Sequence, residues 1–427
     1  MLTNELKKQV QYVDVLVVGA GPAGMAAAIA AREAGIENLL VLEREEHMGG
    51  ILRQCIHNGF GLHRFKEELT GPEYAQRDID EVNRLGIEVR CGTTVLSIDE
   101  DRFVTAISKQ KGVQLFEAGA IVLAMGCRER PRGALATPGS RCAGVYSAGT
   151  AQKFVNLEGY MPGKRVVILG SGDIGLIMAR RMTLQGAKVL ACVEIMPYSG
   201  GLNRNIVQCL EDYDIPLLLS HTVVDIQGKD RLSGVTIAKV DEKRNPIPGT
   251  EQHFDCDTLL LSVGLIPENE LTQQAGVEMS PTTQGAVVDD SLQTSREGIF
   301  ACGNVLHVHD LVDFVSAESF RAGKAAAEFV QGKQRKGRYV ALKDGNGVRG
   351  VVPQRLLIPE AEAEGVQVMF RPAAVYENAT VVVSCGGREL LRQRKRIFTP
   401  GEMAELTLKP DAVAAIDGDT VTVEINP

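Results

Sequence analysis

Two segments of the pattern G-x-G-x-x-G carry the clearest chemistry in the sequence, at residues 19–24 and 170–175. An acidic residue follows 24 positions after the first glycine of each segment, Glu43 in one and Glu194 in the other. In this pattern the first glycine makes a tight turn, the second lets the backbone approach a pyrophosphate, and the third lets a helix pack on a strand. The helix N-terminus attracts the phosphates, and the acid accepts hydrogen bonds from ribose hydroxyls. We therefore predict two dinucleotide-binding units.

The elements that must position these loops follow from the apolar pattern. Apolar runs at 13–18 and 165–169 lead into the two glycine-rich segments, and runs at 39–42 and 188–193 lead into the two acids. A helical stretch separates the two runs of each unit. Strand–turn–helix–strand units of this kind predict an α/β fold made of two Rossmann-like dinucleotide-binding domains.

Two further apolar runs, at 121–126 and 259–264, end in glycine and are expected to return as strands to the two nucleotide domains. Residues 332–338 form a polar, basic linker. Beyond it, short stretches such as 420–425 alternate between apolar and polar residues. Period-two alternation between turn residues predicts a small C-terminal antiparallel β domain.

Composition excludes several classes of protein. The chain has 427 residues and a net charge of −8, which argues against a nucleic-acid partner because such proteins carry a basic surface. The N-terminus has no signal-peptide pattern, and the apolar run that begins at Val13 is broken by Asp14 and by glycines, so no transmembrane segment is expected. We predict a cytoplasmic protein, with attachment to the inner membrane through a complex left open.

Nine cysteines are scattered along the chain without a C-x-x-C pair. The sequence therefore contains no local redox disulfide and no run of zinc or iron–sulfur ligands, and no metal site is expected. An odd number of isolated thiols fits a reducing compartment.

Four features together resemble the pyridine nucleotide–disulfide oxidoreductase superfamily. They are G-A-G-P-A-G with Glu43, A-M-G at 124–126, G-S-G-D-I-G with Glu194, and G-I-F-A-C-G-N at 298–304. The resemblance covers about residues 12 to 332 and is nearest to the thioredoxin-reductase-like branch, without its redox disulfide. It implies that the first unit holds FAD and the second holds NAD. It also implies four segments: an FAD-binding domain at 1–125 and 266–332, an NAD-binding domain at 126–265, and the β domain at 333–427.

Three longer stretches, at 48–61, 126–135 and 302–316, are more particular. They resemble the flavoprotein subunits of opine oxidase and hydrogen cyanide synthase, and FAD-dependent oxidoreductases associated with bacterial glycerol-3-phosphate dehydrogenases. This narrower resemblance implies a hetero-oligomer in which a second flavoprotein dehydrogenase subunit, and a small iron–sulfur protein as a further component, are the partners.

The superfamily resemblance also assigns cofactor-binding residues. For FAD these are Gly19, Gly21, Pro22, Ala23, Gly24, Glu43, Arg44, Gly50, Val95, Ala124, Gly126, Gly303, Asn304 and Val312. For NAD they are Gly170, Gly172, Asp173, Ile174, Gly175, Glu194 and Gly264. Asn304 replaces the usual aspartate that holds the flavin ribityl chain, but its amide oxygen still accepts hydrogen bonds. Glu194 favours NAD over NADP, because a carboxylate repels a 2′-phosphate and residues 195–199 include no base.

Four residues are candidates for catalysis: Cys55, His307, His309 and Asp310. The last three precede a helix expected from about Leu311 whose N-terminus, by resemblance, faces the pyrimidine edge of the flavin. There they could relay a proton or tune the flavin; the alternative is that they cap the helix and line a subunit contact. Cys55 lies where related flavoproteins keep a reactive sulfur, and the alternative is an inert buried thiol.

The sequence thus predicts an FAD-dependent oxidoreductase subunit that exchanges a hydride between NAD(H) and FAD and passes electrons to or from a partner dehydrogenase. Two alternatives remain open at this point. One is a stand-alone NADH oxidase or peroxidase that uses Cys55. The other is a subunit with structural FAD whose partner does the chemistry.

Overall fold

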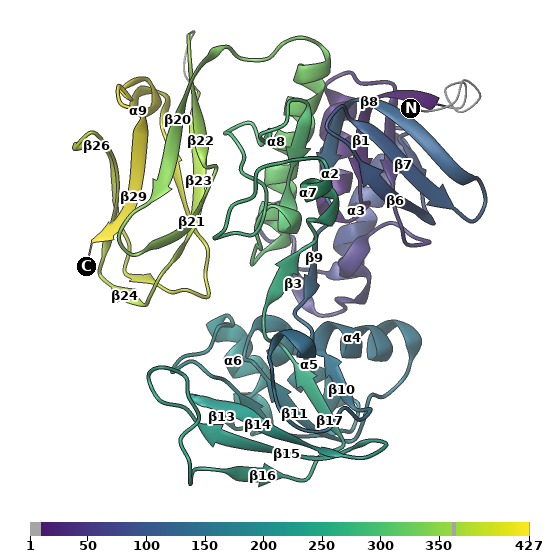
Figure 1. The fold of residues 1–427 in the computed structure, drawn as a ribbon, viewed down its shortest axis with the longest axis vertical. Coiled ribbons are helices and arrows are strands. Elements are labelled where there is room, and N and C mark those ends of the chain that lie inside the picture. Colours follow the sequence, from purple (N-terminus) through teal and green to yellow (C-terminus); the bar gives the residue numbers. More distant parts are fainter. Residues whose placement is uncertain (1–9, 361–363, 427) are drawn as a thin grey trace. The chain divides into compact units, whose positions relative to one another are not determined.

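The computed structural model describes residues 10–360 and 364–426, which fold into two compact units (Figure 1). Unit 1 contains the described residues of 1–53, 58–127 and 267–427. Unit 2 contains residues 54–57 and 128–266. Each unit carries one of the two glycine-rich loops.

The main sheet of unit 1 is built around β1 (Val10–Val18), which pairs in parallel with β2 (Leu39–Leu42) and with β8 (Gly112–Leu123). The parallel pairing continues outward to β5 (Glu88–Arg90) on one side and to β19 (Ile299–Ala301) on the other. Both faces of the central strands are buried, which explains why they read as unbroken apolar runs. The Rossmann-like sheet expected from the sequence is therefore confirmed.

Helices cover this sheet, and two of them cross at close range. In α2 (Pro22–Glu33) half of the residues are alanine, and α8 (Val312–Val330) carries Gly323 at the crossing. A Cβ at Gly323 would lie 2.0 Å from the carbonyl oxygen of Ala27. Small side chains thus let the two backbones approach, and this contact ties the late helix α8 to the first glycine-rich loop.

The sequence did not reveal an antiparallel extension of the same sheet. The N-terminal half of β8 pairs with β7 (Phe103–Ser108), which pairs with β6 (Thr93–Ile98). The strand β8 therefore pairs in parallel with β1 and antiparallel with β7. Unit 1 also contains α3 (Gly71–Arg84), α7 (Glu270–Gln274), β3 (Asn58–Phe60) and β4 (Leu69–Thr70).

Unit 2 has a parallel sheet of five strands and a separate antiparallel sheet of three strands. The parallel sheet runs, in spatial order, β10 (Val145–Ser147), β17 (Thr258–Leu261), β11 (Arg165–Leu169), β12 (Lys188–Val193) and β13 (Leu217–Leu218). The antiparallel sheet contains β14 (His221–Gly228), β15 (Leu232–Lys239) and β16 (Gln252–Phe254). The helices of the unit are α4 (Ala148–Lys153), α5 (Asp173–Leu184) and α6 (Asn203–Cys209).

Residues beyond the linker form two larger β-sheets and a two-stranded one, β24 (Tyr376–Glu377) with β27 (Ile397–Phe398), around their own apolar core. One sheet runs β22 (Arg355–Pro359), β20 (Gly337–Asp344), β29 (Thr420–Asn426), β25 (Thr380–Cys385) and β26 (Arg388–Arg394), and the other runs β21 (Val348–Val352), β23 (Val366–Pro372) and β28 (Ala404–Leu408). The pairing is antiparallel as expected, except that β20 and β29 run parallel. The remaining short elements are β9 (Cys127–Glu129), β18 (Leu265–Pro267) and α9 (Pro410–Ala414).

Two adjacent acids join these C-terminal strands to the rest of unit 1. Asp290 forms an ion pair with Arg335 at 2.6 Å and accepts a hydrogen bond from the backbone N–H of Leu357 at 2.8 Å. Asp289 accepts a hydrogen bond from the hydroxyl of Tyr339 at 3.0 Å. Burial, together with the nearby Asp289, raises the pKa of Tyr339 to about 12, so the phenol stays protonated and donates. The linker is therefore held by buried polar contacts.

We expect Asp290→Ala to lower the free energy of unfolding by about 2 kcal/mol or more, because it leaves Arg335 and a strand N–H without their acceptor. Chemical denaturation followed by circular dichroism measures the change. Arg392→Ala is the matched control: its ion pair with Glu389 is exposed on both sides, so a loss within about 0.5 kcal/mol is expected. Equal losses in the two variants would contradict the assignment of Asp290 as an anchor.

Candidate functional site

In the first glycine-rich loop, the packing of the chain itself leaves no room for a side chain at the first and third glycines, but it leaves room at the middle one. Gly19 has a φ of +105°, and a Cβ at Gly24 would lie 1.7 Å from the carbonyl oxygen of Gly19. A Cβ at Gly21, by contrast, would find its nearest described atom outside the adjoining residues at 3.9 Å, the Cα of Gly50. The chain leaves room beside Gly21, as a backbone that receives a pyrophosphate must.

The second loop repeats this arrangement. Gly170 has a φ of +97°, and a Cβ there would lie 2.0 Å from the carbonyl oxygen of Ser262. At Gly175 the Cβ would meet the Cβ of Ser262 at 2.7 Å, whereas at Gly172 the nearest described atom is 3.5 Å away. The middle glycine again has the most open surroundings of the three.

Each loop opens into a helix whose N-terminus is available to an anion. Gly21 and Gly172 are the N-cap residues of α2 and α5, and as glycines they have no side chain to cap the helix. In the first turn of α5 the hydroxyl of Ser262 accepts a hydrogen bond from Gly175 N at 3.0 Å. Asp173 would repel an anion at the start of α5, but its carboxylate accepts hydrogen bonds from Leu202 N at 2.8 Å and Asn205 Nδ2 at 2.7 Å. Helix N-termini of this kind bind phosphate groups. The donor set therefore fits two dinucleotides.

The two acids at the strand ends have a structural role that the sequence analysis missed. Glu43 accepts hydrogen bonds from Ala20 N at 2.7 Å and from the N–H two residues after it at 2.8 Å. Glu194 accepts from Ser171 N at 2.9 Å and from Met196 N, also at 2.9 Å. Each carboxylate thus clamps the second residue of its glycine loop. The remaining lone pairs of each carboxylate can still accept from ribose hydroxyls, as predicted.

Most of the predicted FAD residues meet around the first loop. A Cβ at Gly19 would lie 2.5 Å from the carbonyl oxygen of Ala124, one at Gly50 would lie 2.9 Å from the Cα of Gly21, and one at Gly303 would lie 2.7 Å from the Cβ of Ala23. Three segments that are distant in the sequence therefore pack against this loop. Of the other predicted residues, Pro22 begins α2, Val95 lies in β6 and Val312 begins α8. Gly126 has a φ of +74°. Arg44 is mostly exposed, and its guanidinium lies 3.8 Å from the carboxylate of Glu268.

The predicted NAD residues all lie in unit 2. Ile174 follows Asp173 in the first turn of α5, and Gly264, with a φ of +101°, follows β17 and accepts a hydrogen bond from Arg130 N at 3.0 Å. The turn after β17 thus lies at the carboxyl end of the parallel sheet, where α/β proteins bind their ligands.

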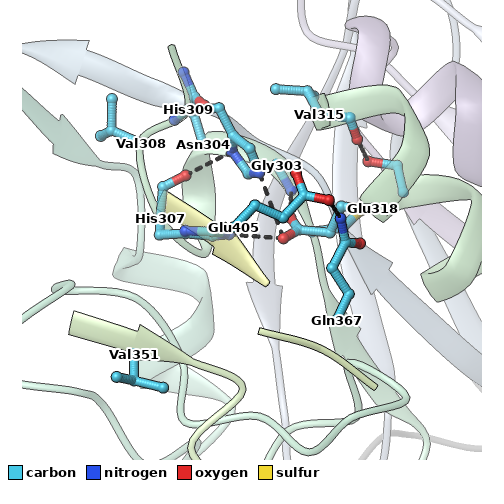
Figure 2. Close-up of polar contacts among 12 residues, drawn as sticks. Gly303, Asn304, His307, Val308, His309, Val315, Glu318, Val351, Gln367 and Glu405 are labelled. Atoms are coloured by element: carbon cyan, nitrogen blue, oxygen red, sulfur yellow. Dashed lines mark hydrogen bonds and ion pairs between the residues drawn. The ribbon is translucent and has the colours of Figure 1, made fainter. Parts of the chain in front are cut away.

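His307 and His309 lie in a buried polar cluster around Glu318, a residue that the sequence analysis missed (Figure 2). His307 Nε2 is 2.7 Å from Glu318 Oε2, and His309 Nε2 is 3.4 Å from the same oxygen. Glu318 Oε1 accepts a hydrogen bond from Gly303 N at 2.7 Å. The available signal was a glutamate on the apolar stripe of α8, between Val315 and Ala322.

Burial and the neighbouring groups act in opposite directions on the pKa values in this cluster. Burial on its own would raise the pKa of Glu318, but the adjacent His307 and His309 hold that pKa well below its usual value. Burial also lowers the pKa of His307, despite the nearby carboxylate. At neutral pH the glutamate is therefore ionised, and the neutral ring of His307 donates to it.

Asp310 and Asn304 both hold the backbone in place. Asp310 forms an ion pair with Arg371 and accepts from Met403 N at 2.7 Å. Asn304 Oδ1 accepts from His309 N at 3.0 Å. The N-cap of α8 is Leu311, and no side chain in the described part of the chain caps that helix. The expectation that the histidines and Asp310 cap α8 is therefore wrong, because Asp310 binds Arg371 and Met403 N instead; that these residues line a subunit contact stays a prediction.

Cys55 does not have the surroundings of a reactive thiolate. Burial raises its pKa to about 12, and its Sγ lies 3.8 Å from Gln152 Oε1. The thiol is therefore protonated at neutral pH, whereas nucleophilic cysteines have a lowered pKa. The structure describes all nine cysteines, and none of them is in a disulfide bond.

Comparison with known proteins identifies the class that this fold and these loops define. Residues 13–335 match the family described as pyridine nucleotide-disulphide oxidoreductase. The chain belongs to this family, and it is an oxidoreductase that binds FAD and a nicotinamide dinucleotide. Over residues 10–360 and 364–426, no helix is both long and apolar enough to cross a membrane.

Similar curated proteins are components of larger enzymes. A subunit of opine oxidase from Agrobacterium tumefaciens (strain Ach5) is 27% identical over 69% of this chain, and the HcnB subunit of hydrogen cyanide synthase from Pseudomonas protegens is 27% identical over 64%. The match spans 61% of the length of both relatives. The small chain of glutamate synthase [NADPH] from Escherichia coli (strain K12) is 26% identical, over 74% of this chain and 68% of its own.

Solved structures show the same fold. Thioredoxin reductase of T. acidophilum superposes with a TM-score of 0.61 at 24% identity, and covers 76% of this chain and 99% of its own. Thioredoxin reductase of Lactococcus lactis superposes with a TM-score of 0.62 at 21% identity, and covers 75% and 99%. These similarities confirm the pair of Rossmann-like domains.

The spacing around the glycines gives a direct test of the first site. We expect Gly21→Ala to fold normally but to bind FAD at least about tenfold more weakly, because the added methyl group fills space that the chain itself leaves open. Gly24→Ala is expected to lose about 3 kcal/mol or more of stability, because its methyl group would overlap a carbonyl oxygen. Thermal unfolding of the apoprotein and fluorescence titration with FAD separate the two effects. Unchanged FAD affinity in Gly21→Ala would contradict the site.

Proposed function

We propose that this chain is the flavoprotein subunit of a heteromeric oxidoreductase. It exchanges a hydride between NAD(H) and FAD and passes electrons to or from a partner dehydrogenase subunit, with an iron–sulfur protein as a further component. In this proposal FAD lies in the domain formed by residues 1–125 and 266–332, NAD in the domain formed by 126–265, and residues 333–427 are the β domain.

The observation that carries the proposal is the presence of two complete nucleotide loops in one chain. Both have an open middle glycine that is also the N-cap of the following helix, and a buried acid that clamps the loop. A protein that needed FAD only as a structural element would have no use for the second loop. The duplication therefore favours redox exchange between two bound nucleotides.

NAD is favoured over NADP by the charge at the second site. The Glu194 carboxylate lies at the end of β12, where a 2′-phosphate would suffer repulsion. Its hydrogen bonds with Ser171 and Met196 hold it in that position. Residues 195–199 supply no Lys or Arg to replace it.

Bound FAD supplies hydride and single-electron chemistry, and the protein supplies position and charge. By family resemblance, the start of α8 lies near the pyrimidine edge of the flavin. The acid in its first turn, Asp313, is buried and accepts hydrogen bonds from Gly61 N at 3.1 Å and Arg64 N at 2.8 Å. Its charge is thereby partly compensated, so the positive end of the helix dipole can favour an anionic ligand.

Electrons are expected to pass from the flavin to another protein of the complex. None of the nine cysteines, all within the described residues, forms a disulfide, and the thiol of Cys55 is held protonated. The dithiol route of disulfide reductases therefore has no support here. The similar proteins from opine oxidase and hydrogen cyanide synthase are by name parts of multisubunit enzymes, which supports a partner for this chain as well.

Anaerobic titration of the full chain with NADH tests the hydride step. We expect the flavin band at about 450 nm to bleach with about one equivalent of NADH, and to need at least about tenfold more NADPH for the same effect. Tight FAD with no bleaching by either nucleotide would instead support the alternative in which FAD is structural.

Replacement of Cys55 tests the peroxidase alternative. Because a thiol with a pKa of about 12 is protonated at neutral pH, we expect Cys55→Ser to keep the rate of NADH oxidation by an artificial electron acceptor within about twofold of the parent chain. Cys385→Ser, in the C-terminal strands, controls for general effects of losing a thiol. A collapse of NADH oxidation confined to Cys55→Ser would favour the peroxidase.

A further inference from the structure

We propose that His307, His309 and Glu318 form a binding site for a divalent first-row transition-metal ion. One ring nitrogen of each histidine and a carboxylate oxygen of the glutamate all lie within 4.8 Å of one another. The Nε2 atoms of both histidines face Glu318 Oε2. Imidazole nitrogen and carboxylate oxygen together suit Zn²⁺ and its neighbours in the series. The three residues lie outside both glycine loops, and the site does not depend on the proposed hydride exchange.

The spacing of the donors is close to that of a coordination shell. Bonds of about 2.0–2.1 Å in a tetrahedral site place neighbouring ligand atoms about 3.3 Å apart. His309 Nε2 and Glu318 Oε2 are already 3.4 Å apart. His307 Nε2, at 2.7 Å, now donates to the same oxygen, and this contact would open by about half an ångström while its proton moves to Nδ1.

One buried atom of the cluster lacks the partner that a cation would provide. His309 Nδ1 is 3.0 Å from the carbonyl oxygen of His307, which can only accept, so Nδ1 carries a proton. The second ring nitrogen, Nε2, lies 3.4 Å from Glu318 Oε2, and among the described residues it has no hydrogen-bond partner. The side chain of His309 is only 1% exposed. A buried ring nitrogen without a hydrogen-bond partner, next to a carboxylate oxygen, marks a position that a metal ion can fill.

The outer contacts of the cluster are those that metal ligands have. Metal-binding histidines donate their second N–H to a carbonyl or carboxylate, and ligating carboxylates are themselves hydrogen-bonded. His309 donates in this way to the carbonyl of His307, and the second oxygen of Glu318 accepts from Gly303 N (Figure 2). Both ligands are thus oriented before any ion binds.

The backbone that carries the histidines is fixed from two sides. Asn304 Oδ1 accepts from His309 N at 3.0 Å, and Arg371 Nη2 donates to the carbonyl oxygen of Val308 at 3.1 Å. The ligands therefore lie on an anchored turn and on the long helix α8. A bound ion would link the turn after β19 to that helix, which should raise the resistance of unit 1 to heat.

Metal analysis of the full FAD-containing chain provides the test. After incubation with Zn²⁺ and gel filtration, we expect about one equivalent of zinc per chain by mass spectrometry, and less than about a tenth of that in His309→Ala and Glu318→Gln. His253→Ala is the matched control, because His253 also lies within 3.3 Å of a carboxylate but in an exposed pair. That variant should keep its zinc.

A second measurement keeps the proposal testable if a variant folds poorly. Co²⁺ added to the parent chain after chelation should give tetrahedral absorption bands at longer wavelengths than the flavin, and Zn²⁺ should raise the thermal midpoint of the parent chain but not of His309→Ala. Less than about a tenth of an equivalent of zinc in the parent chain, with no cobalt bands, would overturn the site. The cluster would then be a hydrogen-bonded His–Glu network. Zinc content is measured on the parent chain without NADH, and bleaching by NADH is measured on the parent chain without added metal, so failure of this site and of the proposed function are distinguishable.

Discussion

Both nucleotide loops depend on one interaction, a buried carboxylate that accepts hydrogen bonds from the backbone of the loop. Glu43 holds Ala20 and Glu194 holds Ser171, and each acid also accepts from the N–H two residues after itself. The acid comes from the next strand of the same parallel sheet, so the clamp forms only when the two strands pair in register. Pairing of Val18 with Leu42 provides that register in unit 1. Strand pairing, loop shape and the position of the acid are therefore one coupled arrangement.

Acidic side chains also connect unit 1 to the strands that follow the linker. Asp289 and Asp290 bind Tyr339, Arg335 and the backbone of β22, while Asp310 binds Arg371 and Met403 N. The family match ends at residue 335, so these strands lie beyond it. Their contacts with Asp310 and Val308 are next to His307 and His309. The β domain thus holds the turn that precedes α8 in place through specific polar contacts.

The sequence was sufficient to predict the features that depend on the local pattern of glycines and apolar residues. The glycine spacing placed both loops, and the apolar runs that lead into Glu43 and Glu194 placed the strands, because turn geometry and burial act within about 25 residues. It could not reveal Glu318, whose partners His307 and Gly303 are defined by how α8 lies against the turn after β19. The sequence analysis also left the antiparallel strands β6 and β7 undetected, because neither glycine motif contains information about their pairing with β8. The raised pKa of Cys55 likewise comes from burial in the folded chain, and the number and spacing of cysteines give no information about that burial.

The two loops share a frame but differ in what surrounds them, and this difference bears on how each nucleotide is used. The first loop is packed against segments around Gly50, Ala124 and Gly303, which come from distant parts of the chain. The second loop packs against one distant segment, around Ser262, and is also covered by a nearby segment, in which Ser199 and Gly200 contact Ser171 and Asp173 accepts a hydrogen bond from Leu202 N. A ligand held between several distant segments leaves only if the unit opens, whereas one covered mainly by a local segment exchanges more easily. A resident cofactor on the first loop and an exchanging nucleotide on the second are what a flavoprotein that turns over NAD(H) requires.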